Sequence, residues 1–94
     1  MRQACTATTL VSDDRVIVTR FDFAPGAQTG WHRHGHDYVI TALTDCPMLI
    51  EDPDGSVRRV MVAAGSAYRR SAGVEHNVIN DGTTAMSFVE VELK

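Results

Sequence analysis

The sequence lacks a hydrophobic run long enough to cross a membrane, because no apolar stretch approaches the roughly 18 residues that a transmembrane helix needs. Its first ten residues, MRQACTATTL, contain no apolar core of about 7–15 residues like that of a secretion signal. A basic stripe is also missing, since the net charge is −3 and basic residues adjoin only as Arg58–Arg59 and Arg69–Arg70. We therefore expect a cytoplasmic protein with neither a membrane nor a nucleic-acid partner.

Cysteine is scarce as well, and the two cysteines, Cys5 and Cys46, do not form a Cys-x-x-Cys pair. Because nothing marks the protein for export, we expect reduced thiols rather than a disulfide. The chain contains no repeats, low-complexity tracts or linker, so residues 1–94 are expected to form one domain. No Ser-His-Asp or Cys-His triad and no glycine-rich phosphate loop is present.

The hydrophobic pattern has a period of two residues almost everywhere, which is typical of β-strands. No segment keeps an i, i+3, i+4 apolar pattern for three helical turns, so no strong helix is expected. Asp-Pro-Asp-Gly at 52–55 and Asp81-Gly82 each predict a β-hairpin turn. Seven to nine short strands in a chain of this size predict an all-β barrel or sandwich. The predicted strands cover residues 15–23, 31–44, 47–51, 56–62, 66–70, 75–80 and 84–93.

The last predicted strand has two different faces. Phe88, Glu90 and Glu92 alternate with a wholly apolar set. That set, Val89, Val91 and Leu93, is expected to pack either in the core or in the interface of a homodimer.

Three of the four histidines, His32, His34 and His36, alternate within TGWHRHGHDYV at residues 29–39. In a strand, residues two apart project from the same face, about 6.6 Å from each other along the chain. Two such imidazoles can share one metal ion at the Zn–N distance of about 2.0–2.1 Å. His36 would stand about 13 Å from His32 in an extended strand, so it joins them only if the chain bends at Gly35. An exposed strand face can also carry histidines that bind nothing.

The spacing of glycines and histidines supplies a second element. Five residues separate Gly26 from His32, and a later series contains Gly65, Gly73, His76 and Asn80 with seven, two and three residues between them. These spacings resemble the two motifs of the cupin superfamily. The segments PGAQTGWHRHGHDYVI and AGVEHNVIN are further similar to small cupins associated with β-alanine degradation.

That resemblance implies a small single-domain cupin-type β-barrel, also called a double-stranded β-helix or jelly roll. It also implies a metal ion held by His32, His34 and His76, with His36 as a further candidate. Two positions depart from the motifs: Ser71 replaces a proline, and Tyr38 or Val39 stands where the first motif has glutamate. Three neutral imidazoles without a carboxylate suit Fe(II), Zn, Ni or Cu and disfavour Mg or Ca.

Tyr38 is expected on the same face as His32 and His34. Its hydroxyl is a candidate hydrogen-bond donor to a bound water or substrate, although the ring could equally be a barrel-lining aromatic. Of Arg69 and Arg70, at most one can face the cavity, where it would bind a substrate carboxylate.

The function that the resemblance implies is metal-dependent. Three-histidine cupins include Fe(II) dioxygenases, so dioxygenase-like oxidoreductase chemistry comes first and isomerase or lyase chemistry second. The substrate would be a small, carboxylate-bearing metabolite of β-alanine-type catabolism. The alternative is a non-catalytic small-molecule-binding or accessory module, and the residues leave the choice between enzyme and binder open.

Overall fold

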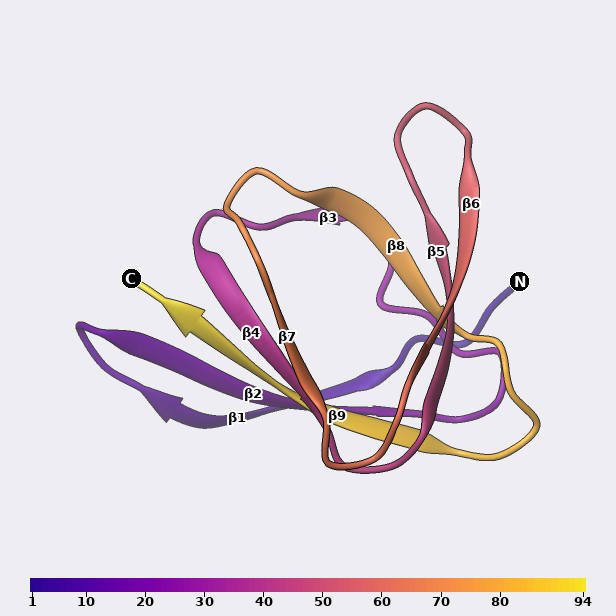
Figure 1. The fold of residues 1–94 in the computed structure, drawn as a ribbon, viewed down its shortest axis with the longest axis horizontal. Helices are drawn as coiled ribbons and strands as arrows, with labels where there is room; N and C mark the ends of the chain where they lie inside the picture. The colour runs from indigo at the N-terminus through magenta and orange to yellow at the C-terminus, as the bar shows by residue number, and fades with distance from the viewer.

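Nine strands and no helix make up the computed structural model, which describes residues 1–94. The strands form two antiparallel sheets that pack around one core (Figure 1). The first sheet has the order β1 (Thr6–Ser12), β2 (Val16–Phe23), β9 (Met86–Leu93), β4 (Asp37–Ala42) and β7 (Ala67–Arg70). The second has the order β3 (His32–Arg33), β8 (Glu75–Asn80), β5 (Cys46–Glu51) and β6 (Val57–Val62). The all-β prediction is confirmed.

Strands β4 and β5 show how the period-two pattern builds the core. Every second residue of each strand is buried and the residues between them are partly exposed, as the alternation of a pleated strand requires. The inward residues are Tyr38, Ile40 and Ala42 on β4, and Cys46, Met48 and Ile50 on β5. Phe23, Met86 and Phe88 fill the space between the two sheets.

The two predicted hairpins have different outcomes. The turn at 52–55 joins β5 to β6 as an antiparallel pair, with Gly55 at a φ of 86° that favours glycine, so this hairpin is confirmed. The hairpin predicted at Asp81-Gly82 is wrong, because β8 pairs with β3 and β5 whereas β9 pairs with β2 and β4.

The buried amide of Asn80 explains how the chain crosses between the sheets after β8. Its Nδ2 donates to the carbonyls of Phe23, Ala24 and Thr84, and its Oδ1 accepts from the amide N–H of Gly82. These bonds direct residues 81–85 from one sheet to the other. Turn residues mark where a chain turns, but they do not select its next partner strand.

The structure also bears on the predictions for residues 31–44, for the two cysteines and for membrane-spanning segments. The single strand expected over 31–44 is divided into β3 and β4 by a bend at residues 34–36, and β1 is an additional edge strand. Cys5 and Cys46 are both free thiols, as expected. No helix is long and apolar enough to cross a membrane.

Candidate metal centre

His32 and His76 lie directly opposite each other. The register of the short β3–β8 pair places His32 across from His76, and residues opposed in this way have neighbouring side chains. The centroids of the two imidazole rings are 4.7 Å apart. The main-chain pairing of β3 with β8 therefore places the imidazole of His76 beside that of His32.

His34 lies just beyond the end of β3, but its backbone is still held. Its N–H donates to the carbonyl of Val74 at 2.8 Å, and its carbonyl accepts from the N–H of Gly73 at 2.8 Å. Gly73 has a φ of 95°, a left-handed conformation that glycine adopts without a Cβ penalty. This turn keeps His34 beside β8 after the regular strand has ended.

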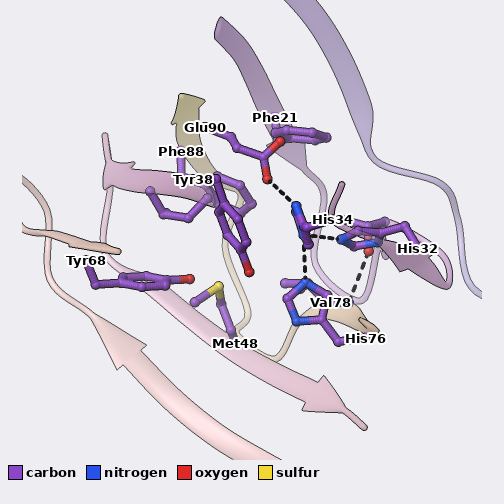
Figure 2. Close-up of a pocket in the computed structure, with 12 residues that line it drawn as sticks. Phe21, His32, His34, Tyr38, Met48, Tyr68, His76, Val78, Phe88 and Glu90 are labelled. Carbon is purple, nitrogen blue, oxygen red and sulfur yellow. Dashed lines mark hydrogen bonds and ion pairs between the residues drawn. The ribbon is translucent and has the colours of Figure 1, made fainter. Parts of the chain in front are cut away.

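The three histidines direct their Nε2 atoms at one point (Figure 2). The Nε2 of His34 is 2.9 Å from that of His32 and 3.2 Å from that of His76. An ion bound at about 2.0–2.1 Å imposes nitrogen separations of about 2.9 Å at a right angle and about 3.3 Å at a tetrahedral angle. Both separations therefore fit a transition-metal ion bound by these histidines.

The opposite ring nitrogens of two of the histidines face oxygen atoms, and for His32 the contact is a hydrogen bond. The Nδ1 of His32 is 2.9 Å from the carbonyl oxygen of Gly30, which can only accept, so His32 carries its proton on Nδ1. The Nδ1 of His34 faces Oε1 of Glu90 at 3.6 Å. Outer acceptors of this kind orient ligating imidazoles in metal proteins. The Nδ1 of His76 is buried without a partner.

Burial keeps two of the imidazoles neutral. Burial, and then the neighbouring His32, lower the pKa of His34 to about 4. Burial, followed by His32 and His34, lowers the pKa of His76 to about 3. At neutral pH both rings therefore offer an unprotonated nitrogen, which is the state that binds a metal ion.

Tyr38 forms a wall of the site. Its ring stacks on His34 with centroids 3.8 Å apart and 16° between the planes. Its hydroxyl is buried without a hydrogen-bond partner and points toward the space between Met48 and His76 (Figure 2). Burial raises the pKa of Tyr38 to about 12, so the phenol stays protonated and remains a donor. An internal cavity of about 20 Å³, lined by Tyr38 and the three histidines among others, has room for about one water-sized group.

A larger hollow of about 440 Å³ adjoins this cavity, and His32, His34 and Glu90 line both. Glu90 and Glu92 project into it from β9, and His36 lies at its edge. The Nδ1 of His36 is 3.2 Å from Oε2 of Glu92, and His36 is not among the three histidines that converge. A small molecule entering through the hollow would meet imidazoles on one side and carboxylates on the other.

The two arginines considered for substrate binding line neither space. Arg69 is exposed and donates to Asp37 at 3.0 Å. Arg70 is half-buried and opposes Tyr38 across the β4–β7 pair, so it is the one on the inner face of the sheet.

Sequence reasoning missed Glu90 as part of the site. The apolar face of the last strand was expected in the core or in a dimer interface; the core alternative is wrong, because the structure turns Phe88 and Glu90 inward and leaves Leu93 exposed. Glu90 is only 6% exposed. One signal in the sequence could have indicated it: Glu90 is two residues from the large aromatic Phe88 and so shares its strand face.

The fold and the site together define a small β-barrel with an interior histidine cluster that could hold a metal ion. Residues 19–92 match the sequence profile described as the cupin domain, and the chain belongs to the cupin family. It is 53% identical over 93 residues to the β-alanine degradation protein BauB of Pseudomonas aeruginosa, which covers 99% of this chain and 97% of that protein.

Solved structures agree with this assignment. A cupin domain from Bordetella pertussis Tohama I is 44% identical, superimposes with a TM-score of 0.95, and the match covers 100% of this chain and 97% of that one. A protein with a double-stranded β-helix domain from Klebsiella pneumoniae superimposes with a TM-score of 0.79 at 20% identity, covering 96% of this chain and 76% of that one. The second likeness concerns the fold alone.

Proposed function

We propose that the chain binds one divalent transition-metal ion through the Nε2 atoms of His32, His34 and His76. The observation that carries this proposal is the convergence of these atoms at 2.9 and 3.2 Å. The low pKa values of His34 and His76 support it, because they leave both rings unprotonated at neutral pH. Fe(II), Zn, Ni and Cu are the ions that suit three imidazole donors.

The bound ion would supply a Lewis acid with coordination positions open to water or substrate. The protein's own contribution is then positioning and exclusion of water. Tyr38 would donate its unpartnered hydroxyl to a small group held in the cavity beside the histidines. The hollow lined by Glu90 and Glu92 would admit the remainder of the molecule.

The substrate proposed is a small, carboxylate-bearing metabolite of amino-acid or β-alanine-type catabolism. Its support is the 53% identity to a protein named for β-alanine degradation. Oxidoreductase chemistry of the dioxygenase type, or isomerase or lyase chemistry, is the proposed class. A non-catalytic binding module would use the same hollow and differ only in turnover. A cytoplasmic location and a homodimer remain predictions from the sequence.

Elemental analysis of a preparation without an affinity tag tests the metal proposal, because a tag brings its own histidines. We expect one transition-metal ion per chain, lost in His76→Ala. His36→Ala is the matched control, since this histidine faces Glu92 and should leave metal content unchanged. Protein that contains no transition metal, and takes up none from Fe(II), Zn, Ni or Cu, would overturn the proposal.

Turnover separates the enzyme from the binding module. Metal-loaded protein is incubated with β-alanine and carboxylates derived from it, and substrate loss is followed with and without oxygen. Consumption that disappears in His76→Ala supports an enzyme. Saturable binding without consumption supports the binding module.

A further inference from the structure

We propose that Asn77 is a positioning residue that fixes the orientation of the ligand His32 through the backbone of Gly30. The proposal rests on the three-histidine metal site proposed above. Asn77 follows His76 on β8 and is 2% exposed. Its side-chain hydrogen bonds go to Thr29, Gly30, Gln28 and Glu51 and not to an imidazole, so its action is indirect.

The side-chain amide of Asn77 is fully used in hydrogen bonds. Its Oδ1 accepts from the N–H of Gly30 at 3.0 Å. Its Nδ2 donates to Oε1 of Gln28 and to Oε1 of Glu51, both at 2.8 Å. A buried amide with partners on both ends is held in one orientation, and it holds the groups that bind it.

The residue whose N–H binds Asn77 is also the residue whose carbonyl orients His32. The carbonyl of Gly30 accepts from Nδ1 of His32 at 2.9 Å and from Oγ1 of Thr29 at 2.9 Å. Gly30 has a φ of 86°, which turns this carbonyl toward the imidazole and which a residue with a Cβ adopts only with strain. The bonded carbonyl keeps the proton of His32 on Nδ1, so the lone pair of Nε2 faces the other two histidines.

One strand therefore supplies both a ligand and the support of the ligand opposite to it. His76 and Asn77 are adjacent on β8, and His32 is the register partner of His76. A displacement of β8 moves the ligand and the support together, which keeps the two imidazoles aligned. Loss of an outer partner lowers metal affinity by roughly 10–100-fold, and an indirect contact should fall near the lower value.

The test is the Zn²⁺ affinity of Asn77→Ala, measured by competition with a chromogenic chelator. We expect a loss of about tenfold. Asn80→Ala is the matched control: the same residue type on the same strand, 1% exposed, with its hydrogen bonds to backbone groups away from the histidines. Asn80→Ala should lower stability in urea as Asn77→Ala does, but it should leave affinity within about threefold of the wild type.

A double-mutant cycle and an NMR readout separate positioning from general damage. In a His32→Ala background, Asn77→Ala should cause no further loss of affinity, since the ligand through which it acts is gone. In Zn-free protein, the ¹⁵N shifts of the His32 ring should report a proton on Nδ1 in the wild type and a mixture of tautomers in Asn77→Ala. If Asn77→Ala does not fold, Gly30→Ala perturbs the same backbone segment, because Ala adopts a φ of 86° only with strain, while its added Cβ meets no atom within 4 Å.

Three outcomes overturn the inference: wild-type affinity in the folded variant, an equal loss in Asn80→Ala, or a full further loss in the His32→Ala background. A wild-type protein that binds no Zn²⁺ would instead refute the proposed metal site. In that case the NMR comparison of the His32 tautomer in the wild type and in Asn77→Ala would still show whether Asn77 positions that ring.

Discussion

Glu90 should reduce the stability of the metal-free protein whenever its carboxyl is ionised. Its side chain is buried against the site, and Oε1 lies 3.6 Å from Nδ1 of His34. Burial, and then the neighbouring Glu92, raise the pKa of Glu90 to about 7. His34, with a pKa of about 4, is neutral at pH 7 and gives the carboxylate no opposing charge.

The sign follows from linkage. A carboxyl whose folded-state pKa lies above its unfolded value contributes stability below the unfolded pKa and loses it as pH rises through the folded pKa. For Glu90 this window runs from 4.5 to about 7. At about 1.36 kcal/mol per pH unit, the loss is on the order of 3 kcal/mol. Glu90→Gln cannot ionise, so it should match the wild type near pH 4.5 and exceed it by about 2–3 kcal/mol at pH 8.5.

The assay is urea unfolding of chelator-treated protein at pH 4.5 and pH 8.5. In thermal unfolding the gain at pH 8.5 should appear as a midpoint about 10 °C or more above that of the wild type. Glu75→Gln is the control, because this carboxylate is exposed and its replacement should act equally at both pH values. The reasoning is refuted if Glu90→Gln changes stability by the same amount at both pH values, or destabilises at pH 8.5. With Zn²⁺ the order should reverse, since a negative charge beside Nδ1 of His34 favours the metal-bound ring and a neutral Gln does not.

Three further predictions follow from individual residues. Tyr38→Phe should keep metal-free stability within about 1 kcal/mol in urea, but weaken azide binding to the Co²⁺-loaded protein up to about tenfold, since only a hydroxyl without a protein partner is removed. In chelator-treated Glu90→Gln, stability in urea should fall from pH 6.5 to 4.5. The reason is that the folded-state pKa values of His34 and His76 lie below their unfolded value, so the unfolded chain binds more protons. Adding His76→Gln should roughly halve that fall. Gly82→Ala should cost about 1–3 kcal/mol in urea, because its Cβ would lie 2.7 Å from a side-chain carbon of Pro47, whereas Gly35→Ala meets open space and should be nearly neutral.

The histidine cluster was predicted through the resemblance of the glycine and histidine spacing to the cupin motifs. Placing His32 and His76 within two glycine-framed motifs was enough to select them, and the β3–β8 pair brings them opposite each other. Strand geometry also set His36 apart from the pair His32 and His34, and in the structure His36 lies outside the cluster. The chain does bend around Gly35, but the bend directs His36 to Glu92 rather than to the cluster.

The supporting residues could not be predicted in the same way. Glu90 and Asn77 act through contacts between strands that are distant in sequence, such as the bond from Asn77 to Gly30 across 47 positions. Local patterns describe which residues share a face, but not which face is turned inward. An alternation of carboxylates with apolar residues normally places the carboxylates in solvent, and here the site reverses that preference.

Tyr38 in place of a carboxylate changes the charge of the whole centre. The three imidazoles carry no charge when they bind, and the phenol, with its pKa of about 12, stays protonated as well. A divalent ion held by these residues would keep its two positive charges, because no ligand would carry a negative charge to neutralise them. The nearest buried carboxylate, Glu90, lies beyond the ring of His34, and charge compensation weakens with distance. With such an ion bound, Glu90 would act on the basicity of His34, and the ion would attract anionic ligands such as carboxylates past the acidic lining of the hollow.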